Sequence, residues 1–91
     1  MAAITRTHEI MNVKGLHARA SAKFVETVEE FDASAYVEKD GLGTTGDSIM
    51  GLLMLAASKG TTIDVKCEGA EAEALADALE TLIRDKFGED M

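Results

Sequence analysis

Residues 34–45 read SAYVEKDGLGTT and carry the clearest structural signal in the chain. Ala35 and Val37 alternate with polar neighbours, which is typical of a half-buried β-strand. The pair Asp40-Gly41 then matches the two-residue turn of a β-hairpin, where both central positions need a positive φ. Because the short segment 42–45 can pair back on residues 34–39, this stretch predicts an antiparallel hairpin.

On the N-terminal side of this hairpin, the sequence predicts a strand followed by a helix. Residues 4–13 are rich in Thr, Ile and Val without helical periodicity, so we expect a strand there. Lys14 and Gly15 form a turn, and a helix runs from about Ala18 to Glu30. Its apolar face contains Ser21, Phe24, Val25, Val28 and Phe31 at helical spacing.

On the C-terminal side, the pattern predicts a short helix, a strand and a long helix. Asp47 is a candidate N-cap for the short helix, and we expect Ser48 to cap it as well. The apolar positions of this helix are Ile49, Leu52, Leu53 and Ala56, and Lys59-Gly60 ends it. The strand contains Ile63, Val65 and Cys67 in alternation, which predicts that Cys67 is buried. The long helix follows Gly69, and its apolar face contains Leu75, Leu79, Leu82, Ile83 and Phe87.

This order, βαββαβα, predicts an α+β fold in which an antiparallel four-stranded sheet is covered on one face by three helices. The length of 91 residues predicts a single domain spanning residues 1–91. Periodicity does not settle the order of the strands within the sheet. The hairpin excludes a purely parallel β-α-β arrangement.

Composition narrows the classes of partner. The net charge of −8 disfavours binding to nucleic acid or to anionic membranes, and aromatic residues make up only 4% of the chain. A lone cysteine points to a reducing compartment, and the N-terminal residues lack the apolar core of a signal peptide. The longest apolar run, 49–57, is too short to span a membrane. We therefore expect a cytoplasmic protein.

The segment 15–21, GLHARAS, places His17 and Arg19 where extended chain gives way to the first helix. Unpaired N–H groups and the helix dipole favour an anion at such an end. A neutral imidazole is nucleophilic near pH 7, and a guanidinium suits phosphate oxygens. These residues predict a phosphoryl-accepting site, in contrast to His8, which we expect to be an ordinary strand residue.

Five motifs together resemble the histidine-containing phosphocarrier (HPr) family of the bacterial phosphotransferase system. They are 15–21, Lys23-Phe24-Val25, Asp40-Gly41, 47–52 (DSIMGL) and Lys59-Gly60-Thr61. The resemblance covers nearly the whole chain and implies an HPr-like open-faced β-sandwich. It also implies a stoichiometric carrier rather than an enzyme, with no cofactor and no metal site.

The resemblance implies a role for several individual residues. His17 corresponds to the histidine that enzyme I phosphorylates on Nδ1, with phosphoenolpyruvate as the ultimate donor. This histidine then passes the phosphoryl group to a histidine of an enzyme IIA protein. Arg19 matches the arginine that stabilises the phosphate, which the backbone at Ala18 and Arg19 also binds. Ser48 matches a serine that HPr kinase/phosphorylase modifies in some members, and the carrier is expected to be a monomer.

The chain departs from the family pattern at two places. Ala20 stands where a proline usually follows the arginine, as in some nitrogen-branch members. Glu26 and Glu29 stand where sugar-branch carriers often have lysines, which leaves the set of partners open, because surface charge around a docking site governs the rate and specificity of association. These departures favour a nitrogen-type or dual-purpose carrier.

Partner proteins are expected to dock on an apolar patch beside His17. Ile49 and Met50 are about 100° apart on a helix, so they cannot both face the core. We expect Met54 and Leu52, in contrast, to be core residues. The predicted docking residues are Leu16, Ala20, Lys23, Ile49, Met50 and Leu53.

One alternative remains open from the sequence. The chain could be a purely regulatory protein-binding module, controlled by phosphorylation of Ser48, in which His17 is incidental. The presence of both His17 and Arg19 argues against this reading.

Overall fold

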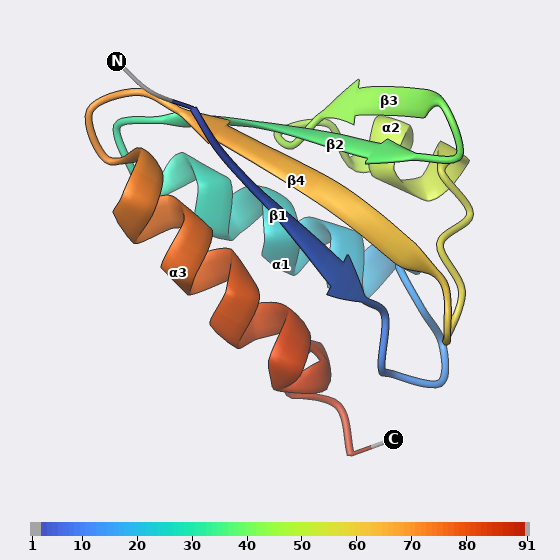
Figure 1. The fold of residues 1–91 in the computed structure, drawn as a ribbon. Helices are drawn as coiled ribbons and strands as arrows, with labels where there is room; N and C mark the ends of the chain where they lie inside the picture. Colours follow the sequence, from blue (N-terminus) through green and yellow to red (C-terminus); the bar gives the residue numbers. More distant parts are fainter. Residues whose placement is uncertain (1–2, 91) are drawn as a thin grey trace.

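The computed structural model describes residues 3–90, and within that range strands and helices follow the predicted order (Figure 1). The α+β fold class is confirmed. The strands are β1 (Ile4–Glu9), β2 (Ser34–Lys39), β3 (Leu42–Thr45) and β4 (Thr62–Glu68). The helices are α1 (Ala18–Glu29), α2 (Ile49–Met54) and α3 (Ala72–Arg84), and a 3-10 turn follows at Lys86–Gly88.

The strands form one antiparallel sheet in the order β1-β4-β2-β3. The predicted hairpin is present as β2 and β3, and Asp40 and Gly41 at its turn have φ values of 51° and 83°. β4 lies between β1 and β2, where Val65 is opposite Arg6 on one side and Val37 on the other. The strand that comes last in the chain therefore holds the sheet together.

The hydrophobic core lies between the sheet and the helices, and α1 and α3 run side by side across one face of the sheet (Figure 1). Phe24 from α1, Leu79 from α3 and Val37 from β2 are fully buried there. Cys67 is also buried, as predicted. Ser21 is one of two buried polar residues in the described chain, with Asn12, and its hydroxyl donates to the Leu16 carbonyl oxygen at 3.1 Å, so the buried hydroxyl is hydrogen-bonded.

Three predicted boundaries are wrong. β1 ends at Glu9 rather than Val13, because Gly15 N–H donates to the Asn12 carbonyl and closes a turn over these residues. α2 ends at Met54, and Ala56 leaves the helical region with a φ of 52°, before Lys59-Gly60. Phe87 is buried as expected, but it lies past α3 in the 3-10 turn.

Of the two residues predicted to cap α2, Ser48 is the N-cap and Asp47 precedes it. The Ser48 hydroxyl accepts a hydrogen bond from Gly51 N–H at 3.0 Å and satisfies a backbone donor of the first turn. None of the helices within residues 3–90 is long and apolar enough to cross a membrane.

Candidate functional site

The site is built around the junction between the β1–α1 loop and α1. His17 is the N-cap of α1, with an extended backbone, and Ser21 N–H donates to its carbonyl oxygen at 2.8 Å. Gly15 has a φ of +65°, which turns the chain into the helix without the steric cost that other residues would incur. Leu16 N–H then donates to the Ala57 carbonyl oxygen at 2.9 Å, so the loop is held against the chain that follows α2.

The two ring nitrogens of His17 have different partners. Nδ1 accepts from the backbone N–H of Arg19 at 3.3 Å, and Nε2 lies against the carboxylate of Glu89. The His17 side chain is 26% exposed, so the ring is half-buried but reachable from solvent. An imidazole with its nucleophilic edge at a helix N-terminus can take up a group of negative charge.

Basic side chains surround this helix end. Lys14, Arg19 and Lys23 line a surface hollow of about 340 Å³ together with Glu89. Arg19 is exposed, so its guanidinium can turn toward an anion bound at His17. Three basic and two acidic residues line this hollow, so the acidic excess of the whole chain does not extend to it.

Glu89 is a site residue that the sequence analysis missed. Its carboxylate accepts from Asn12 Nδ2 at 3.0 Å and contacts His17 Nε2. The hydrogen bond from Asn12, followed by that from His17, holds the pKa of Glu89 below its ordinary value, although partial burial opposes the shift. The only available signal was the Gly-Glu-Asp sequence after the last helix, which also fits an ordinary acidic tail.

The predicted docking residues divide into buried and exposed groups. Leu16 and Ala20 are buried at 4% and 0% exposure, so they pack in the core and offer no docking surface. Lys23 is half-buried and its ammonium donates to the Phe87 carbonyl oxygen at 2.6 Å. Ile49 and Met50 are exposed and Leu53 is half-buried, which leaves an apolar surface on α2.

Met54 corrects a second expectation. It is 70% exposed, whereas Leu52 is fully buried as predicted. Met54 stands one turn after Met50, so both thioethers lie on the same exposed side of α2. We call the exposed residues Ile49, Met50 and Met54, with half-buried Leu53, the α2 surface.

The α2 surface adjoins His17 through the chain that follows the helix. Ala56, Ala57 and Ser58 form a shallow hollow of about 210 Å³ with Leu16 and His17. Ser48, at the other end of α2, is half-buried and its hydroxyl serves as the N-cap. Ser48 therefore stands at the start of α2, and the segment that follows the end of α2 borders His17.

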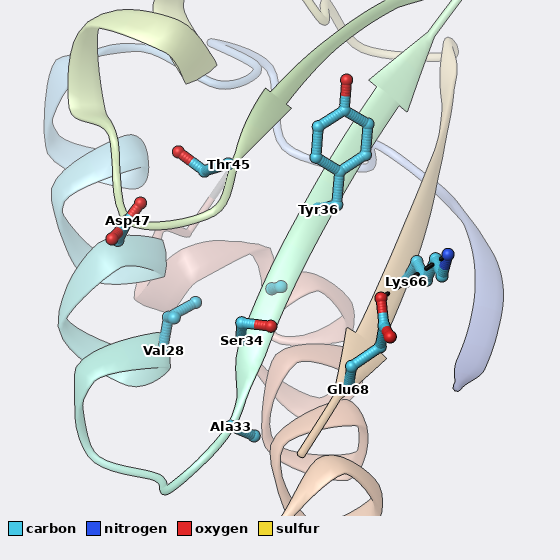
Figure 2. A pocket seen from close by; sticks show the side chains of 9 residues that line it. Val28, Ala33, Ser34, Tyr36, Thr45, Asp47, Lys66 and Glu68 are labelled. Atoms are coloured by element: carbon cyan, nitrogen blue, oxygen red, sulfur yellow. Dashed lines mark ion pairs between the residues drawn. The ribbon is translucent and has the colours of Figure 1, made fainter. Parts of the chain in front are cut away.

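A separate surface hollow of about 400 Å³ lies beside strands β2 and β4 (Figure 2). Ser34, Tyr36, Thr45, Asp47 and Glu68 line it, and Lys66 pairs with Glu68 across 3.5 Å. Its lining residues contain neither a histidine nor a cysteine, so they supply no counterpart of the His17 nucleophile. The hollow does not compete with His17 as a phosphoryl-accepting site.

His8 lies in β1 and is half-buried, as expected for a strand residue. Burial holds its pKa below the ordinary value, and Arg6 and Arg84 add to that effect, whereas Glu80 opposes it. Within residues 3–90, no group of three or more His, Cys, Asp or Glu side chains is placed to hold a metal ion.

Comparisons with known proteins identify the family of the chain. The family model described as "PTS HPr component phosphorylation site" matches residues 4–85. Phosphocarrier protein HPr of Neisseria meningitidis serogroup A is 52% identical over 82 residues, which cover 89% of this chain and 91% of the relative. Phosphocarrier protein NPr of Shewanella violacea is 37% identical over 89 residues, 98% of both chains.

The fold comparison gives the same result. The crystal structure of an HPr from Thermoanaerobacter tengcongensis matches with a TM-score of 0.90 and 41% identity, and the match covers both chains completely. The likeness therefore extends over the sheet and the helices of the whole chain. The chain belongs to the HPr family of phosphocarrier proteins of the phosphotransferase system.

Proposed function

We propose that this chain is a cytoplasmic phosphoryl carrier that works through a covalent phosphohistidine at His17. Enzyme I, charged by phosphoenolpyruvate, donates the group to Nδ1, and a histidine of an enzyme IIA protein accepts it. The carrier is consumed and regenerated stoichiometrically, so the proteins on either side supply the catalysis. The observation that carries this proposal is the place of Nδ1 at the N-terminus of α1, 3.3 Å from Arg19 N–H.

The surroundings of Nδ1 suit the charged product better than the unmodified ring. In the phosphorylated state, the N–H groups of Ala18 and Arg19 donate to phosphate oxygens, and the helix dipole adds to the stabilisation. The Arg19 guanidinium supplies further charge-assisted hydrogen bonds from the solvent side. Transfer remains reversible because this stabilisation comes from an open, half-exposed site.

Partner recognition is assigned to the α2 surface. Its exposed apolar side chains precede residues 56–58, which line a hollow with His17, so a protein seated on both can reach the imidazole. Phosphorylation of Ser48 by an HPr kinase/phosphorylase would add negative charge beside Met50 and oppose docking of an acidic partner. Exposed Glu26 and Glu29 on α1 favour a nitrogen-branch partner set or use of both branches.

Labelled phosphoenolpyruvate and enzyme I test the carrier step. The expected product carries one phosphate that is labile in acid and stable in base, and His17→Ala abolishes it whereas His8→Ala keeps it. Arg19→Lys should slow transfer roughly tenfold without unfolding the chain, because the planar guanidinium fork is lost. An unmodified His17 in the folded protein would contradict the proposal and favour a regulatory binding module.

A second assay separates the two branches. The kcat/KM for phosphorylation is expected to be higher with nitrogen-branch enzyme I than with sugar-branch enzyme I. Replacing Glu26 and Glu29 together by lysine should reduce that preference by changing the rim charge. An unchanged preference would contradict the role assigned to these two carboxylates.

A further inference from the structure

The C-terminal segment of this chain reaches the ring edge of His17 that faces away from the helix. After α3, Lys86 and Phe87 adopt left-handed backbone conformations with φ of 54° and 56°, and Gly88 continues at 78°. The chain is thereby folded back toward the β1–α1 loop. Glu89, five residues past the end of α3, lies beside Asn12 and His17.

Three contacts fix this segment in place. The Phe87 ring is fully buried in the core, and the Lys23 ammonium donates to the Phe87 carbonyl oxygen at 2.6 Å. Glu89 N–H donates to the Lys86 carbonyl oxygen at 3.0 Å. Because both sides of the turn are held, the Glu89 side chain is only 16% exposed.

Asn12 orients the Glu89 carboxylate. Asn12 is fully buried, and its Nδ2 group donates to the Gly15 carbonyl oxygen at 2.9 Å and to Glu89 at 3.0 Å. Both neighbours are acceptors, so only the amide NH₂ can face them. Among the described residues the Asn12 Oδ1 atom has no hydrogen-bond partner, so the amide is placed for its two donations alone.

The two sides of the His17 ring require the same tautomer. Nδ1 faces a backbone N–H, so in the neutral ring it must be the acceptor and carry the lone pair. Nε2 faces a carboxylate and must therefore carry the proton. A carboxylate that binds one imidazole nitrogen in this way orients the other nitrogen for attack.

We propose that Glu89, held by Asn12, is a positioning residue that keeps the His17 imidazole in its Nε2–H tautomer and directs the Nδ1 lone pair to the incoming phosphoryl group. This inference rests on the proposed carrier function. The Nδ1 lone pair forms the new N–P bond, and the donor's bond to phosphorus breaks with its electrons leaving on the donor. Nε2 keeps its proton, so the ring becomes positively charged, and the adjacent carboxylate stabilises that charge.

Nitrogen NMR of the His17 ring in the full chain tests the positioning directly. At a pH where the ring is neutral, the wild type should show protonated Nε2 and unprotonated Nδ1. Glu89→Ala and Glu89→Gln should both give a mixture of the two tautomers, because a glutamine has one acceptor oxygen where the Glu89 carboxylate accepts from both Asn12 and His17. Asp90→Asn, an exposed change one residue further on, is the matched control and should match the wild type.

The rate of phosphoryl uptake from enzyme I gives the second measurement. Glu89→Ala and Glu89→Gln should both slow uptake roughly tenfold, the lower end of the effect of carboxylates that orient a reactive imidazole, because both lose the charge. An unchanged tautomer in Glu89→Ala, an unchanged uptake rate, or an equal loss in Asp90→Asn would overturn the inference. If the wild type takes up no phosphate, the carrier function fails, whereas the NMR result still decides whether Glu89 positions the ring.

Discussion

The backbone N–H of Leu16 donates to the carbonyl oxygen of Ala57 at 2.9 Å, which joins the loop before α1 to the chain after α2. This bond places the residue before His17 directly against the segment that leads away from the α2 surface. Gly15 makes the approach possible, since a side chain there would overlap the Ala57 carbonyl oxygen and lie 2.9 Å from the Ser58 Cα. The geometry of the site therefore depends on one glycine that takes no part in the chemistry.

Gly15→Ala is expected to lower the free energy of unfolding by about 2 kcal/mol or more. A positive φ costs an alanine roughly 1–2 kcal/mol, and the close backbone contact adds to that cost. Urea unfolding measures the change. Gly41→Ala is the matched control because Gly41 has a φ of +83° with no heavy atom within 4 Å of the added carbon. Equal losses in the two variants would show that the approach to Ala57 is not costly.

Ser48→Ala should destabilise the protein by about 1 kcal/mol, because the N-cap hydrogen bond to Gly51 is lost. Ser48→Thr should retain most of the stability, since the threonine hydroxyl can also cap. Thermal unfolding of both variants, with exposed Ser34→Ala as control, measures the effect. A Ser48→Ala variant as stable as the wild type would remove the capping role.

Met50→Lys is expected to lower kcat/KM for phosphorylation by enzyme I about tenfold, because a charged side chain replaces an apolar contact at the centre of the α2 surface. Met50 is 68% exposed, so the fold should be unaffected, which circular dichroism checks. Leu42→Lys, at an exposed position on the hairpin, is the control. A similar loss in both variants would point to a general charge effect and not to docking at α2.

The pKa of His8 predicts a pH-dependent contribution to stability. Burial lowers this pKa in the folded protein, so between the folded value and the ordinary value near 6.5 the unfolded chain binds more protons. The stability contributed by the neutral ring is therefore present above pH 6.5 and declines as the pH falls through that value. His8→Gln should flatten the difference in unfolding free energy between pH 7.5 and 5.5 relative to the wild type.

Parallel urea titrations of the wild type and His8→Gln at several pH values check this expectation. The charged groups that face His8 are Glu80, Arg6 and Arg84, and they remain in both proteins. The difference between the two curves thus isolates the histidine. If lowering the pH raised the unfolding free energy of the wild type more than that of His8→Gln, the expected direction of the pH dependence would be wrong.

Local pattern was enough to predict most elements of the fold. Alternation located β2 and β4, and helical spacing located α1 and α3, because each buries one face against the same core. The strand order could not be predicted, because it depends on which strands pair in space and hydrophobic periodicity carries no information about pairing. The ends of β1 and α2 were missed because a backbone turn at Asn12 and a left-handed Ala56 decide them.

The candidate site divides in the same way. His17 and Arg19 could be found from the sequence because their chemistry and the helix start lie within a few residues. Glu89 could not, because 72 positions separate it from His17 and the turn that returns it depends on a buried Phe87. Burial of Leu16 and exposure of Met54 were likewise decided by how α2 lies against α1.

The strand order has a consequence for how the chain folds as it is synthesised. β1 and β2 both pair with β4 and not with each other, so the sheet lacks its central member until residue 68 has left the ribosome. We infer that nascent chains ending before residue 62 stay unfolded and that cooperative folding begins only after β4 emerges. Force measured on stalled nascent chains of increasing length should therefore peak late, and a peak before β4 is exposed would contradict this order of events.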